Sequence, residues 1–253
     1  MNRHFFSIVL TSTFTLGAGC GSSAIGGRVE NEGTSASSSA SVGEVSLPGR
    51  PCTPSNTSMA PADGFIADFA EAGSRGIEIS GGIVTYPAPK VGGPSSPGYT
   101  IAGGALTVTV NVSPTSKPQF VGALVSFDKC IDASAFSGVQ FTISGSLSGC
   151  QMQYATGDVA HQDITLGSRY ASGPAGAYPP QFRIAADDLT STSRTIKAPF
   201  ARPDIRGNPA TAFDPTKLIF TLWQFTVPVA PEDDGGIEMC TGSVTIDDVR
   251  FYR

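Results

Sequence analysis

Apolar and polar side chains alternate along several short segments of this chain, as in β-strands that bury one face. The clearest case spans residues 139–143, where Val, Phe and Ile occupy every second position. A period of two places these side chains on one face of a sheet and the intervening polar residues on the other. A Gly- and Ser-rich turn over 145–149 follows, and residues 150–154 alternate again with two glutamines. The pattern predicts a hairpin-like pair with one apolar face and one amide-rich face.

Other segments show the same strand signals, separated by Gly, Pro, Asn and Asp. The expected strands are 65–69, 77–79, 83–86, 106–112, 123–127, 181–184, 196–200, 218–227 and 244–252. Leu218–Val227 is the most hydrophobic of them, which predicts a central strand covered on both faces. Because no amphipathic helical pattern exceeds two turns, the chain is expected to be all-β, in a sandwich.

The composition supports one exported β-domain with a tail. Of 253 residues, 30 are Gly and 19 are Pro, and only 15% are charged. The net charge of −5 is mild and no basic stripe is present, which argues against nucleic-acid binding.

The N-terminus has the layout of a secretory signal, expected over residues 1–19. A short basic start precedes an apolar run over 5–16 that is too short to span a bilayer. Gly19 and Cys20 match the end of a lipobox, whereas Gly17 stands where that pattern prefers Leu. Two alternatives therefore stay open: a lipoprotein of the outer membrane or cell surface, lipidated at Cys20, or a simply secreted protein.

A segment rich in Ser, Gly, Ala, Thr and Pro follows over residues 20–60 and has too few large apolar residues to form a core. We expect a flexible tether there, spanning roughly 35 Å as a random coil of about 40 residues. A disordered tail without an anchoring role is the alternative. The folded domain is expected over 61–253.

Four cysteines remain after Cys20, and an even number in an exported chain favours disulfides. Since no CxxC motif or Cys/His cluster accompanies them, a zinc site is not expected. Of the three pairings, we favour Cys130 with Cys150, which closes a loop through the central strands. Cys52 with Cys240 would then link the start of the domain to its last strand.

Three short motifs suggest a family. They are Cys130, Asp132, Ala133, Ser134, Phe136, Gly138, Val139 and Phe141; the opening segment 64–69; and the closing segment 244–252. Together these motifs resemble carbohydrate-binding-module-type jelly rolls of the galactose-binding-like superfamily, over roughly residues 62–253. The resemblance implies a jelly-roll β-sandwich and a carbohydrate-binding function.

Catalytic residues are scarce. His4 lies in the signal, so a catalytic triad would depend on His161, and no G-x-S-x-G motif accompanies it. Adjacent acids such as Asp187 and Asp188 would point to opposite faces of a strand and cannot share one site. We expect no enzymatic activity.

Sugar binding needs planar amides for paired hydrogen bonds to hydroxyls, and aromatic rings to stack on the pyranose face. The expected ligand-binding residues are Gln151, Gln153, His161, Tyr170, Tyr178, Trp223 and Gln224. Gln140 would share the amide-rich face of the hairpin, and His161 and the tyrosines would lie on a rim loop. The alternatives are that Trp223 packs in the core, the glutamines are only solvated and His161 makes loop hydrogen bonds.

The resemblance also implies a structural calcium ion between the first and last strands, with Asp68 and Asp247 or Asp248 as ligands. Ala67 and Ala70 replace the acids that such a site usually contains, so solvated acids are the alternative. No other cofactor is expected.

These observations predict a non-catalytic, surface-anchored protein that contacts a polysaccharide or glycan through a concave sheet face and rim loops. The first alternative is a structural or adhesive surface protein that uses the sandwich for protein contact. The second is an accessory module of a larger assembly whose enzyme lies on another chain.

Overall fold

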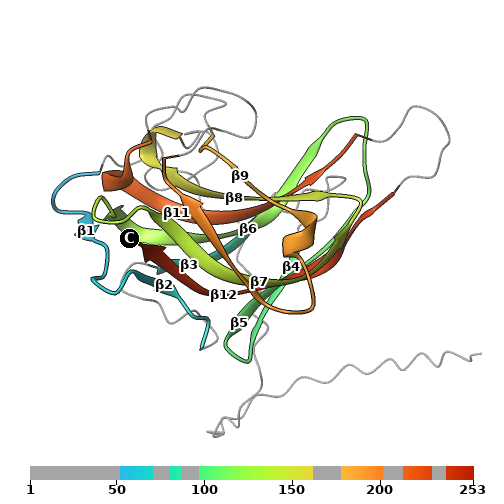
Figure 1. Ribbon diagram of the computed structural model, residues 1–253. Helices are drawn as coiled ribbons and strands as arrows, with labels where there is room; N and C mark the ends of the chain where they lie inside the picture. The colour runs from blue at the N-terminus through green and yellow to red at the C-terminus, as the bar shows by residue number, and fades with distance from the viewer. Residues whose placement is uncertain (1–51, 71–79, 87–96, 162–177, 202–212, 230–237) are drawn as a thin grey trace, which may run out of the picture. The chain divides into compact units, whose positions relative to one another are not determined.

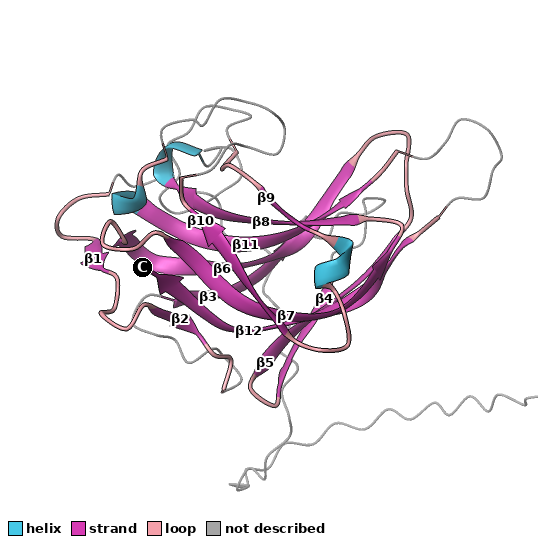
Figure 2. Cartoon of the chain, in the orientation of Figure 1, coloured by secondary structure: helices cyan, strands magenta, loops and turns pink. Residues whose placement is uncertain are grey.

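The computed structural model describes residues 52–70, 80–86, 97–161, 178–201, 213–229 and 238–253. These residues form a β-sandwich of two sheets, each with six strands (Figures 1 and 2). The expected all-β sandwich is confirmed. The signal segment, Cys20 and the tether up to residue 51 lie outside the described residues, as does the expected strand 77–79.

The first sheet, called sheet A here, has the strand order β1-β6-β11-β8-β9, and β3 also pairs with β6. Only β1 runs parallel to its neighbour. The strands are β1 (Thr57–Met59), β3 (Ser80–Tyr86), β6 (Gln119–Asp132), β8 (Gln151–Asp158), β9 (Phe182–Ile184) and β11 (Leu218–Val227).

The second sheet, sheet B, has the order β10-β7-β12-β5-β4, with β2 also paired to β12. Its strands are β2 (Phe65–Ala67), β4 (Gly98–Ala102), β5 (Ala105–Val112), β7 (Gly138–Ser148), β10 (Arg194–Pro199) and β12 (Cys240–Tyr252). The helical elements in the described part of the chain are short 3₁₀ turns: η1 (Val159–His161), η3 (Ala186–Asp188) and η4 (Pro215–Lys217). No helix among the described residues is long and apolar enough to cross a membrane.

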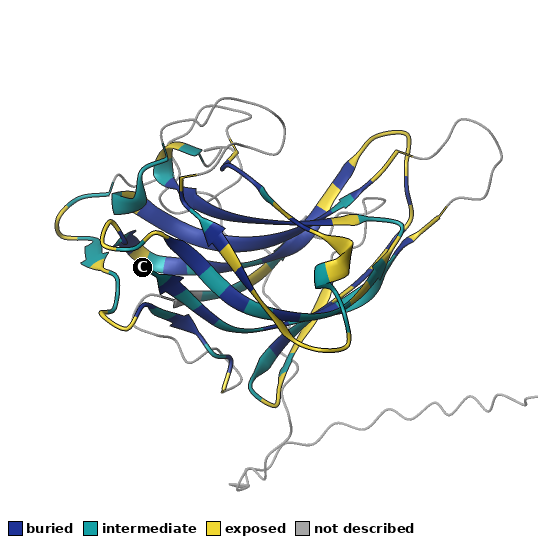
Figure 3. Ribbon diagram, in the orientation of Figure 1, coloured by how far each residue is buried: buried dark blue, intermediate teal, exposed yellow. Residues whose placement is uncertain are grey.

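The core lies between the sheets and consists of the apolar side chains that each strand directs inward. At its centre Trp223 packs edge-on against Phe141, with ring centroids 5.5 Å apart, and lies 5.8 Å from the ring of Tyr154. All but one of the residues of β11 are buried, and the strand lies between β6 and β8, as the continuous apolar run predicted (Figure 3).

The expected hairpin of β7 and β8 is wrong, because the two strands belong to different sheets. β7 pairs with β10 and β12, whereas β8 pairs with β11 and β9. The connection passes through Gly149, whose φ of +70° is costly for other residues and where a Cβ would meet the carbonyl oxygen of Met239 at 2.2 Å. Gln140 therefore lies in sheet B, opposite Lys197, apart from the glutamines of β8.

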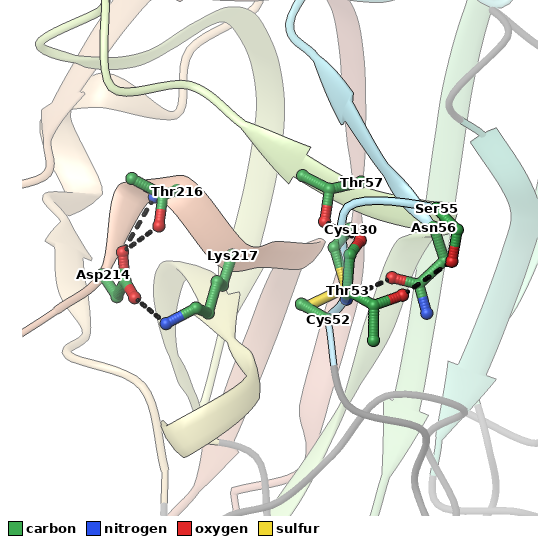
Figure 4. Close-up of a disulfide and its surroundings, with 9 residues drawn as sticks. All are labelled: Cys52, Thr53, Ser55, Asn56, Thr57, Cys130, Asp214, Thr216 and Lys217. Carbon is green, nitrogen blue, oxygen red and sulfur yellow. Dashed lines mark hydrogen bonds and ion pairs between the residues drawn. A yellow bond between two sulfur atoms is a disulfide. The ribbon is translucent and has the colours of Figure 1, made fainter.

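All four expected cysteines form disulfides, but the predicted pairing is wrong. The bonds join Cys52 to Cys130 and Cys150 to Cys240, with Cα–Cα distances of 5.8 and 5.0 Å. The first follows from β1, which aligns Thr57 with Cys130 in parallel register and brings the preceding Cys52 alongside (Figure 4).

The second bond follows from the pairing of β12 with β7, which aligns Thr241 with Ser148. Cys240 therefore lies beside the connection that carries Cys150. Since β1 and Cys52 belong to the sandwich, the sheet begins before the expected boundary at residue 61.

Candidate functional site

The outer face of sheet A gathers polar side chains at the middle of its central strands. Trp223 and Phe225 point into the core, so Gln224 between them points outward. The register aligns Gln224 with Gln153 on β8 and with Gly122 on β6. Gln224 and Gln153 therefore lie side by side on this face.

Hydrogen bonds link these side chains into a line across the sheet. The Tyr86 hydroxyl donates to Gln224 Oε1 at 3.3 Å, and Gln224 Nε2 donates to Gln153 Oε1, also at 3.3 Å. Arg183 on β9 pairs in register with Gln153 and extends the line to the sheet edge. We call Tyr86, Gln224, Gln153 and Arg183 the amide row.

Tyr86 reaches Gln224 because its neighbour on β6 is a glycine. A Cβ at position 122 would lie 2.6 Å from the Tyr86 hydroxyl oxygen. A larger residue there would therefore clash with the phenol ring of Tyr86. Burial raises the pKa of Tyr86 well above its ordinary value of 10.0. The phenol therefore stays protonated at neutral pH and keeps its hydrogen to donate.

An aromatic side chain lies one rung away on the same face. Phe120, 52% exposed, pairs in register with Thr226, which in turn pairs with the exposed Gln151. Gln153 and Gln224 keep only 7% and 8% exposure. The two glutamines of the amide row are therefore nearly buried, whereas the side chains of Phe120 and Gln151 are exposed to solvent.

Sequence reasoning missed Tyr86, Phe120 and Arg183 as site residues. For Phe120 a signal exists: it is out of phase with the buried Val121, Ala123 and Val125, so the alternation places it on the outer face. For Tyr86 and Arg183 no local pattern in the sequence shows that their strands, β3 and β9, belong to the same sheet as β8 and β11.

A cleft of about 290 Å³ lies where the face reaches β9. Its lining includes Gln151 and Met152 of β8, Arg183 and Ile184 of β9, and Leu147 of β7 in sheet B. The cleft therefore adjoins the amide row through Arg183.

The structure places Trp223 in the core, which is the packing alternative to its expected role in ligand binding. The side chain is 0% exposed between the sheets. A Trp in a strand covered on both faces contributes its large apolar area to the core.

His161 is likewise engaged in loop structure and is not brought to the amide row. Its Nδ1 lies 2.7 Å from Oδ1 of the wholly buried Asp158, and its backbone N–H donates to the same oxygen at 2.8 Å. Asp158 Oδ2 accepts from the backbone N–H of Asp214 at 2.7 Å. These bonds join η1 to the segment before η4, which is the loop hydrogen-bonding alternative.

Of the two tyrosines expected on the rim loop, one lies among the described residues. Tyr178 is 47% exposed shortly before β9. Tyr170 lies outside the described residues.

Asp68 and Asp247 lie near enough to interact electrostatically, but each accepts a local backbone hydrogen bond. Asp68 Oδ1 accepts from Ala70 N at 3.0 Å, and Asp247 Oδ1 accepts from Asp248 N at 2.6 Å. In the part of the chain that the structure describes, no group of three or more acidic, His or Cys side chains is placed to hold a metal. The calcium ion stays a prediction.

Asp247→Asn is expected to raise the melting temperature at pH 7. Burial raises the pKa of Asp247 from its ordinary 3.8, and the charges of Asp248 and Asp68 add to the shift. A carboxyl with a raised folded-state pKa holds its proton more tightly when folded, so its contribution to stability falls as pH rises above 3.8. Asparagine keeps the acceptor oxygen and removes the charge.

The measurement is the Tm of wild type and variant between pH 3 and pH 7, with Asp187→Asn on exposed η3 as a control. The advantage of the variant should disappear as the pH is lowered toward the unfolded-state pKa. An equal advantage at every pH would contradict the electrostatic cause.

No protein-family model matches this chain, and no curated protein matches it. Solved structures do match. One is a family 11 carbohydrate-binding module from Clostridium thermocellum in complex with a β-1,3-1,4-mixed-linked tetrasaccharide, with 13% identity, a TM-score of 0.40, and coverage of 74% of this chain and 94% of that chain. Another is a family 30 carbohydrate-binding module of a cellulosomal cellulase of Clostridium thermocellum, with 16% identity, a TM-score of 0.37, and coverage of 66% and 90%. The chain is thus similar in structure to family 11 and family 30 carbohydrate-binding modules.

Proposed function

We propose that this domain binds a polysaccharide or glycan without cleaving it, through the outer face of sheet A. The observation that carries the proposal is the amide row, in which two glutamines are held in fixed orientation beside an exposed aromatic ring. Planar amides offer a donor and an acceptor side by side, which suits two neighbouring hydroxyls of a sugar. The Phe120 ring would pack against the C–H face of a pyranose.

The fixed orientation of the row is what favours recognition. Because Tyr86 holds Gln224 and Gln224 holds Gln153, the amides lose little rotational freedom when a sugar binds. Because Phe120 and Gln151 on this face are exposed, water would remain around much of a bound chain, and we expect modest affinity. We also propose that this binding face is concave, as expected from the sequence.

The site of action is proposed to be outside the cytosol. The two disulfides are typical of proteins in oxidising compartments. Lipidation at Cys20, with the Ser- and Gly-rich segment that follows it as the tether, would hold the domain at a membrane surface. Fractionation of cells that express Cys20→Ser should show release from the membrane fraction if this anchoring is correct.

The test is a binding screen of the full oxidised chain against neutral and acidic polysaccharides by affinity electrophoresis and calorimetry. Gln153→Ala and Gln224→Ala should each weaken binding about 5- to 150-fold, because a lost hydrogen bond that leaves its partner unpaired costs about 1–3 kcal/mol. Gln140→Ala, which removes the same amide from sheet B, is the matched control.

Near-wild-type Tm values would establish that the variants remain folded. Equal loss in all three variants, or no binding by the folded wild type, would count against the amide row. In the second case the adhesive alternative gains support from Val84, 49% exposed, and its apolar partner Leu124 on the next rung of this face.

A further inference from the structure

We propose that the cleft beside β9 binds an anionic sugar unit, carrying a carboxylate or a sulfate ester, of a chain that lies along the amide row. This inference rests on the proposed function and narrows its ligand class. It follows from the charge of the cleft, the direction of the hydrogen bonds that lead to it, and its size.

Arg183 places a basic residue at the cleft. Among the described residues that line the cleft, Arg183 is the charged one, and Asp187 and Asp188 of η3 lie between the lining residues Ala186 and Leu189. Arg183 is exposed, and it forms no ion pair with an acid in the part of the chain that the structure describes. The nearby acid Asp188 is already engaged, because it accepts from the backbone N–H of Ala185 and lies 3.8 Å from Arg194. An anion would therefore find an available guanidinium.

At the end next to the cleft, the amide row presents hydrogen-bond donors. Each bond runs in the same sense, from Tyr86 to Gln224 and from Gln224 to Gln153, so each glutamine oxygen already accepts one hydrogen bond and has one lone pair left. Gln153 Nε2 donates to no described residue, and Arg183, its partner in register, carries only donors. Donors without acceptors at one end of a row favour a ligand with several acceptor oxygens.

The size and lining of the cleft fit one sugar unit. Its volume of about 290 Å³ lies at the lower limit of pockets for small molecules. Leu147, Met152, Ile184 and Leu189 supply an apolar lining for the C–H groups of the ring, while Gln151 stands at the polar rim. The anionic substituent would then point toward Arg183.

The experiment compares matched ligands on the full oxidised chain. The probes are polygalacturonate and its carboxyl-reduced form, and carrageenan and its desulfated form, together with neutral mixed-linkage β-glucan. We expect at least one acidic polysaccharide to bind about 10-fold or more tightly than its neutral counterpart, and Arg183→Gln to remove that difference. Lys197→Gln, which removes one exposed positive charge from sheet B, should leave it unchanged.

Each other outcome has a definite meaning. If neutral polysaccharides bind as well as acidic ones and depend on Gln153, the inference is wrong while the proposed function stands. If Arg183→Gln and Lys197→Gln weaken acidic binding equally, the preference is a general charge effect and the inference is again wrong. If no polysaccharide binds the folded wild type, both the proposed function and the inference fail.

Discussion

Replacing Trp223 with alanine is expected to cost about 3–5 kcal/mol of the free energy of unfolding, the range for truncating a large buried aromatic side chain. Trp223 is 0% exposed and packs against both Phe141 and Tyr154 at the centre of the sandwich. These rings come from three strands and both sheets, so the cavity cannot close without moving the sheets. Urea unfolding at pH 7 measures the loss.

Trp223→Phe provides the control, since it keeps a ring against Phe141 and should cost much less. It also removes the buried Trp223 Nε1, which has no hydrogen-bond partner among the residues that the structure describes. Glycan binding by folded Trp223→Phe should match wild type. A large loss of binding with unchanged stability would contradict the placement of Trp223 in the core.

Replacing Cys52 and Cys130 together with serine is expected to destabilise the domain by about 2–5 kcal/mol, the usual cost of losing a native disulfide. The bond links residues 78 apart in the chain and holds the segment before β1 against β6. Without it, that segment keeps only the short parallel pairing of β1. Thermal unfolding of the oxidised double variant gives the magnitude.

Peptide mapping of the oxidised wild type under non-reducing conditions tests the pairing itself. It should yield fragments that join Cys52 to Cys130 and Cys150 to Cys240. A fragment joining Cys130 to Cys150 would contradict the structure. The Cys150→Ser, Cys240→Ser double variant should show a loss of similar size, since its bond spans a separation of 90 residues.

The alternation of side chains was enough to predict most strands and their buried phases. Residues 106–112 become β5 almost as predicted, because a period of two depends only on neighbours in the chain. The same local rule placed Gln153 on the amide-rich face of its strand. Residues 218–227, predicted from a continuous apolar run, become β11.

Only the tertiary structure decided which strands pair. β7 and β8 have the pattern of a hairpin, yet each finds its neighbours elsewhere in the chain, and the disulfide pairing changes with them. The amide row likewise needs β3, β11, β8 and β9 in one sheet before Tyr86 and Arg183 join the glutamines. Periodicity determines which face of a strand is buried, whereas contacts distant in sequence determine its neighbours, and a surface site is made of neighbours.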